Sequence, residues 1–94
     1  MKTILEAIQQ YPDQFIGTIN ARAETTPSET NRIAHLHMAD MIMLGNWVTV
    51  KERLFDMDYR KPLDGVVACL TRYSDMDHET FWEIFELFEE GKIV

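Results

Sequence analysis

The spacing of apolar residues constrains the fold of this chain more than any other feature of its sequence. Apolar side chains recur three and four residues apart, and proline, glycine or helix-capping residues interrupt them at intervals. This period is typical of amphipathic α-helices, whereas half-buried strands show alternation. Only residues 13–24 also fit an extended, alternating pattern, and a helix to about residue 23 is favoured there because no second strand could pair with it. The sequence therefore predicts an all-α fold.

Capping residues divide the chain into four to five short helices, with one longer central helix over about residues 27–44. We expect these helices to pack as a compact bundle. Thr26 is predicted to cap the central helix, because a proline and then a glutamate follow it in the order of a capping box. Thr49 and Pro62 are predicted to begin later helices. The 94 residues suffice for one core, so residues 1–94 are assigned to a single helical domain.

The central helix carries apolar residues on two sides. Ala34 and Met38 belong to the face predicted to point into the core, together with Met41 and Gly45. Roughly opposite lies a second apolar face, which either packs inside the bundle or contacts a partner or a second copy of the chain. It consists of Leu36, Met43 and Trp47.

The net charge of −7 is confined to one end of the chain. Residues 75–90 hold seven of the sixteen acidic residues and none of the nine basic ones, so the rest of the chain is neutral. Asp77 is predicted to cap a last helix that ends at Gly91. Acidic residues near its C-terminus oppose the helix dipole and repel one another, which points to solubility or to a basic partner. The candidate partner-binding residues are Glu79, Trp82, Glu83, Glu86, Glu89 and Glu90.

Metal, cofactor and catalytic sites find little support in the sequence. His35 and His37 are two residues apart and would point in different directions on a helix, so they cannot share a metal ion. His35 is expected on the solvent side and His37 at the rim of the core. An EF-hand match starting at Asp75 fails because Thr80 stands where the glycine belongs. Cys69 lies among apolar residues and the chain has no nucleophile or phosphate-loop motif, so we predict no metal, no cofactor and no enzyme activity.

These observations favour a small acidic protein that acts by protein–protein interaction. The leading hypothesis is a regulator or inhibitor of a basic, nucleic-acid-handling partner, of the kind that mobile elements encode. Two alternatives stay open. One is a helix-turn-helix-like DNA-binding regulator reading with Lys51 and Arg53, although Glu52 and two nearby aspartates make a poor groove-facing surface. The other is a structural subunit of a homo-oligomer.

No segment reaches the roughly 20 apolar residues that a bilayer span requires, and residues 1–5 do not resemble a signal peptide. We therefore expect no membrane association and a cytoplasmic location, with which a single cysteine is consistent. Direct nucleic-acid binding is disfavoured by the negative net charge.

Overall fold

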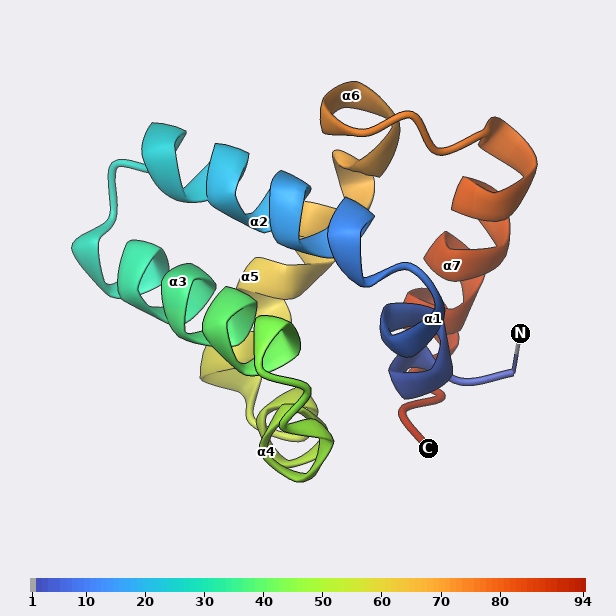
Figure 1. Cartoon of the computed structure of the whole chain (residues 1–94), viewed down its shortest axis with the longest axis horizontal. Helices are drawn as coiled ribbons and strands as arrows, with labels where there is room; N and C mark the ends of the chain where they lie inside the picture. The colour runs from blue at the N-terminus through green and yellow to red at the C-terminus, as the bar shows by residue number, and fades with distance from the viewer. Residues whose placement is uncertain (1) are drawn as a thin grey trace.

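The structure, a computed structural model, describes residues 2–94, and within that range it contains only helices and their connections (Figure 1). The all-α prediction is confirmed, but the predicted number of helices is too low. The described residues form seven helices: α1 (Ile4–Gln10), α2 (Pro12–Thr25), α3 (Glu29–Met43), α4 (Trp47–Leu54), α5 (Met57–Ala68), α6 (Leu70–Tyr73) and α7 (His78–Glu90).

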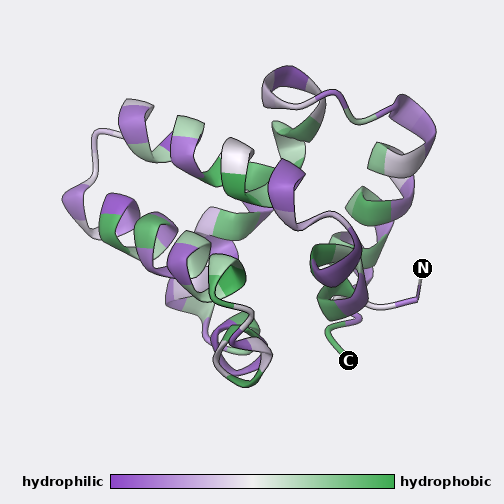
Figure 2. Cartoon of the chain, viewed as in Figure 1, coloured by the Kyte–Doolittle hydropathy of each residue, from purple (hydrophilic) through white to green (hydrophobic). Residues whose placement is uncertain are grey.

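The helices surround one cluster of buried apolar residues. α2 and α3 form an antiparallel pair, α5 contacts both of them, and α1 and α7 pack together on the other side of the molecule (Figure 1). Phe15 and Ile19 of α2 lie at the centre, and the ring of Phe15 stacks on that of Phe88 in α7 at 6.4 Å. Figure 2 shows the hydrophobic residues of α7 on its inner side and the hydrophilic ones facing outward. The helical periodicity of the sequence thus corresponds to a shared core.

Backbone hydrogen bonds join the two ends of the chain. The amide of Ile4 donates to the carbonyl of Lys92 at 2.7 Å, and the amide of Leu5 donates to the carbonyl of Ile93 at 3.2 Å. Both amides belong to the first turn of α1, where a helix has no internal acceptors for its N–H groups. The residues that follow α7 therefore complete the start of α1, and both chain ends lie on the same side of the molecule (Figure 1).

The predicted start of the central helix is wrong by two residues. Ser28, not Thr26, caps α3, and its hydroxyl accepts from the amide of Asn31 at 3.3 Å. Thr26 instead ends α2, where its amide donates to the carbonyl of Arg22 at 3.0 Å. Because α2 extends to Thr25, Thr26 is the C-cap of α2 and does not cap α3. Residues 13–24 are helical, as favoured.

The predicted starts at Thr49 and Pro62 are also wrong. α4 begins at Trp47, and the side chain of Asn46 caps it by accepting from the amide of Thr49 at 3.3 Å. Pro62 lies inside α5, which begins after the capping residue Asp56. Pro62 has no amide hydrogen to donate to the carbonyl of Asp58, four residues earlier. The helix continues through the proline despite this missing hydrogen bond.

The buried face of α3 is rotated from the one predicted. Ala34 and Met38 are buried as expected, but Met41 is only half-buried, and Gly45 is exposed with a φ of 68° that ends the helix. α3 packs against α2, α4 and α5, so its buried arc is wide and also includes Ala39 and Ile42. His35, expected in solvent, is 4% exposed.

Candidate protein-binding surface on the last helix

α7 begins and ends where the sequence predicted. The carboxylate of Asp77 accepts from the amide of Thr80 at 2.7 Å, and the hydrogen bonds from Thr80 hold the pKa of Asp77 below its ordinary value. At the other end Gly91 adopts a left-handed conformation with a φ of 68°. A residue without a Cβ adopts that conformation without strain, so the acidic helix has a firm stop.

The inner side of α7 fixes which residues face outward. Phe81, Ile84, Leu87 and Phe88 are buried, and Phe85 is half-buried. At about 100° per residue, six of the remaining residues fall within an arc of about 120°. We call this set the acidic stripe: Glu79, Trp82, Glu83, Glu86, Glu89 and Glu90, all of them exposed.

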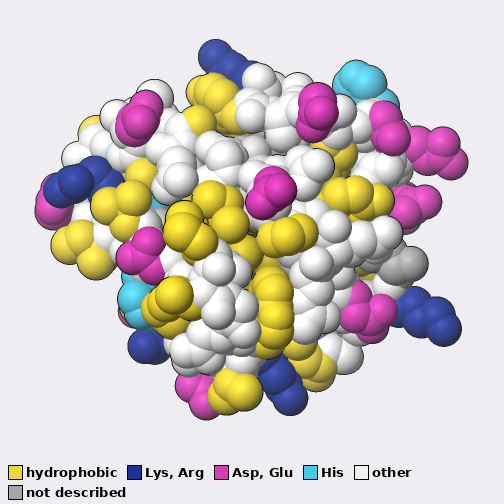
Figure 3. Space-filling model, in the orientation of Figure 1, with side chains coloured by type: hydrophobic (Ala, Val, Ile, Leu, Met, Phe, Trp, Pro, Cys, Tyr) yellow, Lys and Arg dark blue, Asp and Glu magenta, His cyan; other side chains and the backbone are white. Residues whose placement is uncertain are grey.

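The acidic stripe is almost free of compensating cations. Of its five glutamates, only Glu90 forms an ion pair with a residue in the range 2–94: it pairs with Lys92 at 2.8 Å, and that pairing raises the pKa of Lys92. The other four glutamates lie three or four residues apart along the helix, where like charges repel. Figure 3 shows acidic side chains gathered at the right-hand edge of the molecule, the side that α7 occupies in Figure 1. This edge therefore carries an unneutralised negative field.

Trp82 is the apolar member of the acidic stripe and lies at the edge of the stripe nearest to Phe85. Its side chain is 55% exposed, yet its ring meets the rings of Phe81 and Phe85 edge-on, at 5.2 and 5.5 Å. Edge-to-face contacts of this kind are favourable and restrict the rotamers of the ring. These contacts restrict the motion of the indole, which reduces the entropy that a partner must overcome to bind it.

Arg60 of α5 secures the C-terminal end of α7. It is 9% exposed, donates from Nη2 to the carbonyl of Phe88 at 2.8 Å, and places its guanidinium over the Phe88 ring. Its Nε also pairs with Asp64 at 3.2 Å. A cation at a helix C-terminus offsets the dipole that the glutamates there aggravate. Sequence reasoning missed Arg60, because nothing local connects it with a carbonyl 28 residues away.

A groove runs beside the acidic stripe between α5 and α7. It has a volume of about 410 Å³, with Phe85, Phe88 and Val67 as apolar lining and the carboxylates of Asp64 and Glu89 among its walls. An aliphatic stem that ends in a positive charge matches such a lining, because the stem packs on the rings while the charge meets a carboxylate. The side chains of lysine and arginine have this shape.

The second predicted face, on the central helix, is only partly present. Leu36 is 40% and Met43 is 64% exposed, so both face solvent. Trp47 does not join them, because it is half-buried and packs against the core as the first residue of α4. Ile33, at 57% exposed, extends this face toward the start of α3.

No three His, Cys, Asp or Glu side chains among residues 2–94 lie close enough to hold a metal ion together. In the same range, each helix is too short or too polar to cross a membrane.

In comparisons with known proteins, the chain matches no protein-family model, no curated protein and no solved structure.

Proposed function

We propose that this protein binds a basic protein through the acidic stripe and thereby regulates or inhibits it, without catalysis of its own. The observation that carries this proposal is an exposed tryptophan, held by two neighbouring rings, beside glutamates of which four lack a cationic partner among residues 2–94. Aromatic anchors in the middle of an interface supply much of the binding energy, while surrounding charge accelerates association and selects the partner.

The density of charge supports a nucleic-acid-handling partner. Five glutamates lie between Glu79 and Glu90, a length of about 16 Å at 1.5 Å per residue, which gives one charge per about 4 Å. One strand of a DNA duplex carries one phosphate per about 3.4 Å of helix axis. A protein surface that holds a phosphate backbone would therefore meet a comparable row of charge on α7, and occupation of that surface would exclude the nucleic acid.

The neighbouring groove extends the surface toward α5. A lysine or arginine of the partner can lay its stem across Phe85, whose ring meets that of Trp82, and direct its charge to Glu89. Asp64 contributes less, because Arg60 already neutralises part of its charge. The expected contact area thus combines the acidic stripe with one side of α5.

The test is affinity capture with the wild-type protein and two variants of the acidic stripe. Trp82→Ala removes the anchor, and the triple variant Glu83→Gln, Glu86→Gln, Glu89→Gln removes three charges. We expect a basic protein that the wild type retains at low salt and that both variants lose. Calorimetry with that purified protein should show affinity falling steeply between 50 and 300 mM salt, because exposed charges are screened over about a Debye length.

A matched control separates a specific surface from general acidity. The triple variant Glu24→Gln, Asp40→Asn, Glu52→Gln removes the same number of charges from exposed positions on α2, α3 and α4. It should bind like the wild type. Equal loss in the control, or retention of the partner by Trp82→Ala, would contradict the proposed surface.

A second candidate function is supported by the exposure of Leu36 and Met43. Together with Ile33 they leave apolar area on the outer side of α3, which a second copy could cover in a structural assembly. Light scattering of the wild type and of Leu36→Asp tests this candidate. A monomeric wild type across the micromolar range would remove it.

The DNA-reading alternative is weaker on geometric grounds. The guanidinium of Arg53 lies over the ring of Tyr59 at 4.7 Å and is half-buried, so it is directed back into the protein. Lys51 remains as an exposed basic residue on α4, and the exposed Glu52 lies next to it. A helix that reads a DNA groove carries more positive charge than this.

A further inference from the structure

A pocket lies away from α7, in contact with α2, α3 and α5. It has a volume of about 410 Å³, and its lining includes Arg22, Asn31, His35, Asp58 and Lys61. Pockets that hold small molecules begin at about 300 Å³. Whereas the surface of α7 is acidic, this lining contains two permanent cations against one carboxylate.

Arg22 is a half-buried cation without a carboxylate partner among residues 2–94. Its guanidinium lies against α5, where a Cβ added to Gly65 would come within 2.9 Å of Nη2. Its one hydrogen bond runs from Nη1 to the sulfur of Cys69 at 3.6 Å, and Nε is buried without any acceptor. A guanidinium has five donors, and leaving most of them unpaired in a partly buried place is costly. Arg22 is therefore suited to receive an anion.

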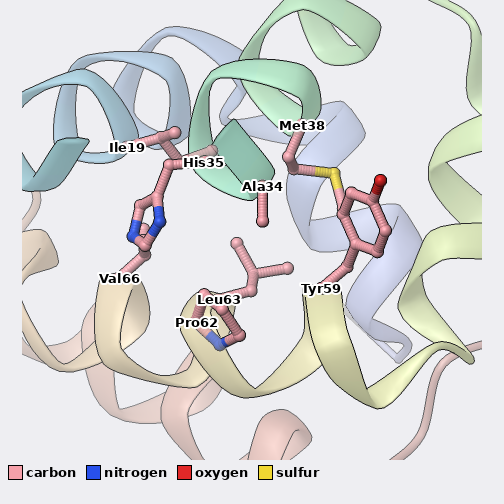
Figure 4. Close-up of a pocket in the computed structure, with 8 residues that line it drawn as sticks. All are labelled: Ile19, Ala34, His35, Met38, Tyr59, Pro62, Leu63 and Val66. Carbon is pink, nitrogen blue, oxygen red and sulfur yellow. The ribbon is translucent and has the colours of Figure 1, made fainter. Parts of the chain in front are cut away.

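His35 supplies a second unpaired group. It is 4% exposed, and its Nδ1 lies 2.6 Å from the carbonyl of Asn31, which leaves Nε2 buried without a partner. Figure 4 shows the ring between α3 and α5, beside a cavity of about 10 Å³ that is lined mostly by apolar side chains such as Ile19 and Val66. That cavity is at the lower limit for one water and offers few polar contacts. His35 also lines the larger pocket, which has room for a hydrogen-bonding partner of this imidazole.

Lys61 completes the positive character of the pocket. It is exposed on α5, three residues after Asp58, yet the two do not form an ion pair. The negative charge of Asp58 offsets one of the two positive charges of Arg22 and Lys61, so the pocket keeps an excess of positive charge. Arginine binds phosphate in a forked geometry, and lysine adds a mobile point charge.

We propose that this pocket binds a phosphate group, with Arg22 and Lys61 as its cationic contacts and Nε2 of His35 as a further hydrogen-bond partner. The imidazole nitrogen accepts from a phosphate hydroxyl when the ring is neutral and donates to a phosphate oxygen when the ring is protonated. This site is separate from the acidic stripe, so either proposal can fail without the other.

The experiment is a calorimetric titration of the full chain with inorganic phosphate, in which sodium chloride keeps the ionic strength constant. Lys61→Gln should weaken binding by at least tenfold, and Asp58→Asn should strengthen it several-fold, because it removes the opposing carboxylate. Both positions are exposed, so the fold should persist. Gly65→Ala adds a second, charge-neutral test: its methyl group displaces Arg22 and should also weaken binding.

Lys51→Gln is the matched control, because it removes one exposed positive charge outside the pocket. It should bind phosphate like the wild type. Equal weakening in Lys51→Gln and Lys61→Gln, or no change in Lys61→Gln, would overturn the site. Acetate that binds as strongly as phosphate would overturn the assignment to phosphate.

A further arm distinguishes the two sources of a phosphate group. Glycerol 3-phosphate that binds more tightly than inorganic phosphate, with the same loss in Lys61→Gln, would indicate a phosphorylated organic molecule. Equal or weaker binding of the ester would indicate the free ion. Either result supports the phosphate site.

Discussion

At the scale of single residues, Arg60 is the side chain that ties α5 to the end of α7. Its buried guanidinium donates to the carbonyl of Phe88 and packs on the Phe88 ring. A hydrogen bond from a charged group contributes about 1.5–3 kcal/mol, so Arg60→Ala should lower the free energy of unfolding by about 2 kcal/mol. Urea denaturation measures this change.

The control for that prediction is Arg72→Ala. Arg72 also lies over an aromatic ring, that of Tyr73, but it is exposed and makes no ion pair within residues 2–94. Its removal should change stability by less than about 0.5 kcal/mol, as is usual for surface substitutions. Equal losses in the two variants would mean that Arg60 does not hold the end of α7.

Asp77 makes stability depend on acidity. Its pKa is lowered in the folded protein by the hydrogen bonds from Thr80, so the stabilisation is present above the pKa of an unfolded aspartate. It is lost as the pH falls through the lower, folded value. Thermal unfolding between pH 2 and pH 6 should therefore show a decline that is smaller in Asp77→Asn, which keeps an N-cap oxygen but does not titrate. An identical decline in this variant would contradict the assignment.

At the scale of helices, the all-α class could be predicted from apolar spacing, although residues 13–24 also fitted an extended pattern, but the number of helices and several boundaries could not. Residues 25–28 contain three hydroxyl side chains and a proline, and each hydroxyl is a candidate cap. The choice of Ser28 depends on how far α2 extends, which the packing of α2 against α3 decides. Pro62 was also a misleading signal, because α5 already begins after its N-cap Asp56 and continues through the proline.

The candidate surfaces differ in how far the sequence could predict them. The acidic stripe follows from Asp77, Gly91 and a helical wheel, because α7 has one strongly apolar side. α3 is apolar on two sides, so the wheel alone could not place His35 inside or Trp47 against the core. The phosphate pocket joins residues of three helices and has no local pattern in the sequence.

Substitution by alanine should change the stability of the protein in opposite directions at two glycines, one inside α2 and one directly after α7. Gly17 is exposed inside α2, and nothing lies near an added Cβ, so Gly17→Ala should raise the free energy of unfolding by about 0.5–1 kcal/mol. Gly91 has a φ of 68°, where a side chain is strained, so Gly91→Ala should lower it by about 1 kcal/mol. Chemical denaturation of both variants checks the pair, and a stabilising Gly91→Ala would show that this stop is not needed.

At the scale of the whole molecule, the acidic stripe should oppose stability. Changing Glu83, Glu86 and Glu89 to glutamine removes like-charge pairs that each cost about 0.2–0.5 kcal/mol, so the free energy of unfolding should rise by about 1 kcal/mol in total at low salt. The gain should fade in 1 M salt, where charges are screened within about 3 Å. Denaturation at two salt concentrations measures it. A loss of stability at low salt would mean that these glutamates help to hold the fold.

The hydrogen bonds between residues 4–5 and residues 92–93 also bear on the order in which the helices can assemble. The amides of Ile4 and Leu5 and their acceptors on Lys92 and Ile93 are 88 residues apart in each pair. Closing so long a loop costs more conformational entropy than forming a helix locally does, so the first turn of α1 is completed only after α7 is in place. The packing of α1 on α7 is therefore expected to be a late event in folding.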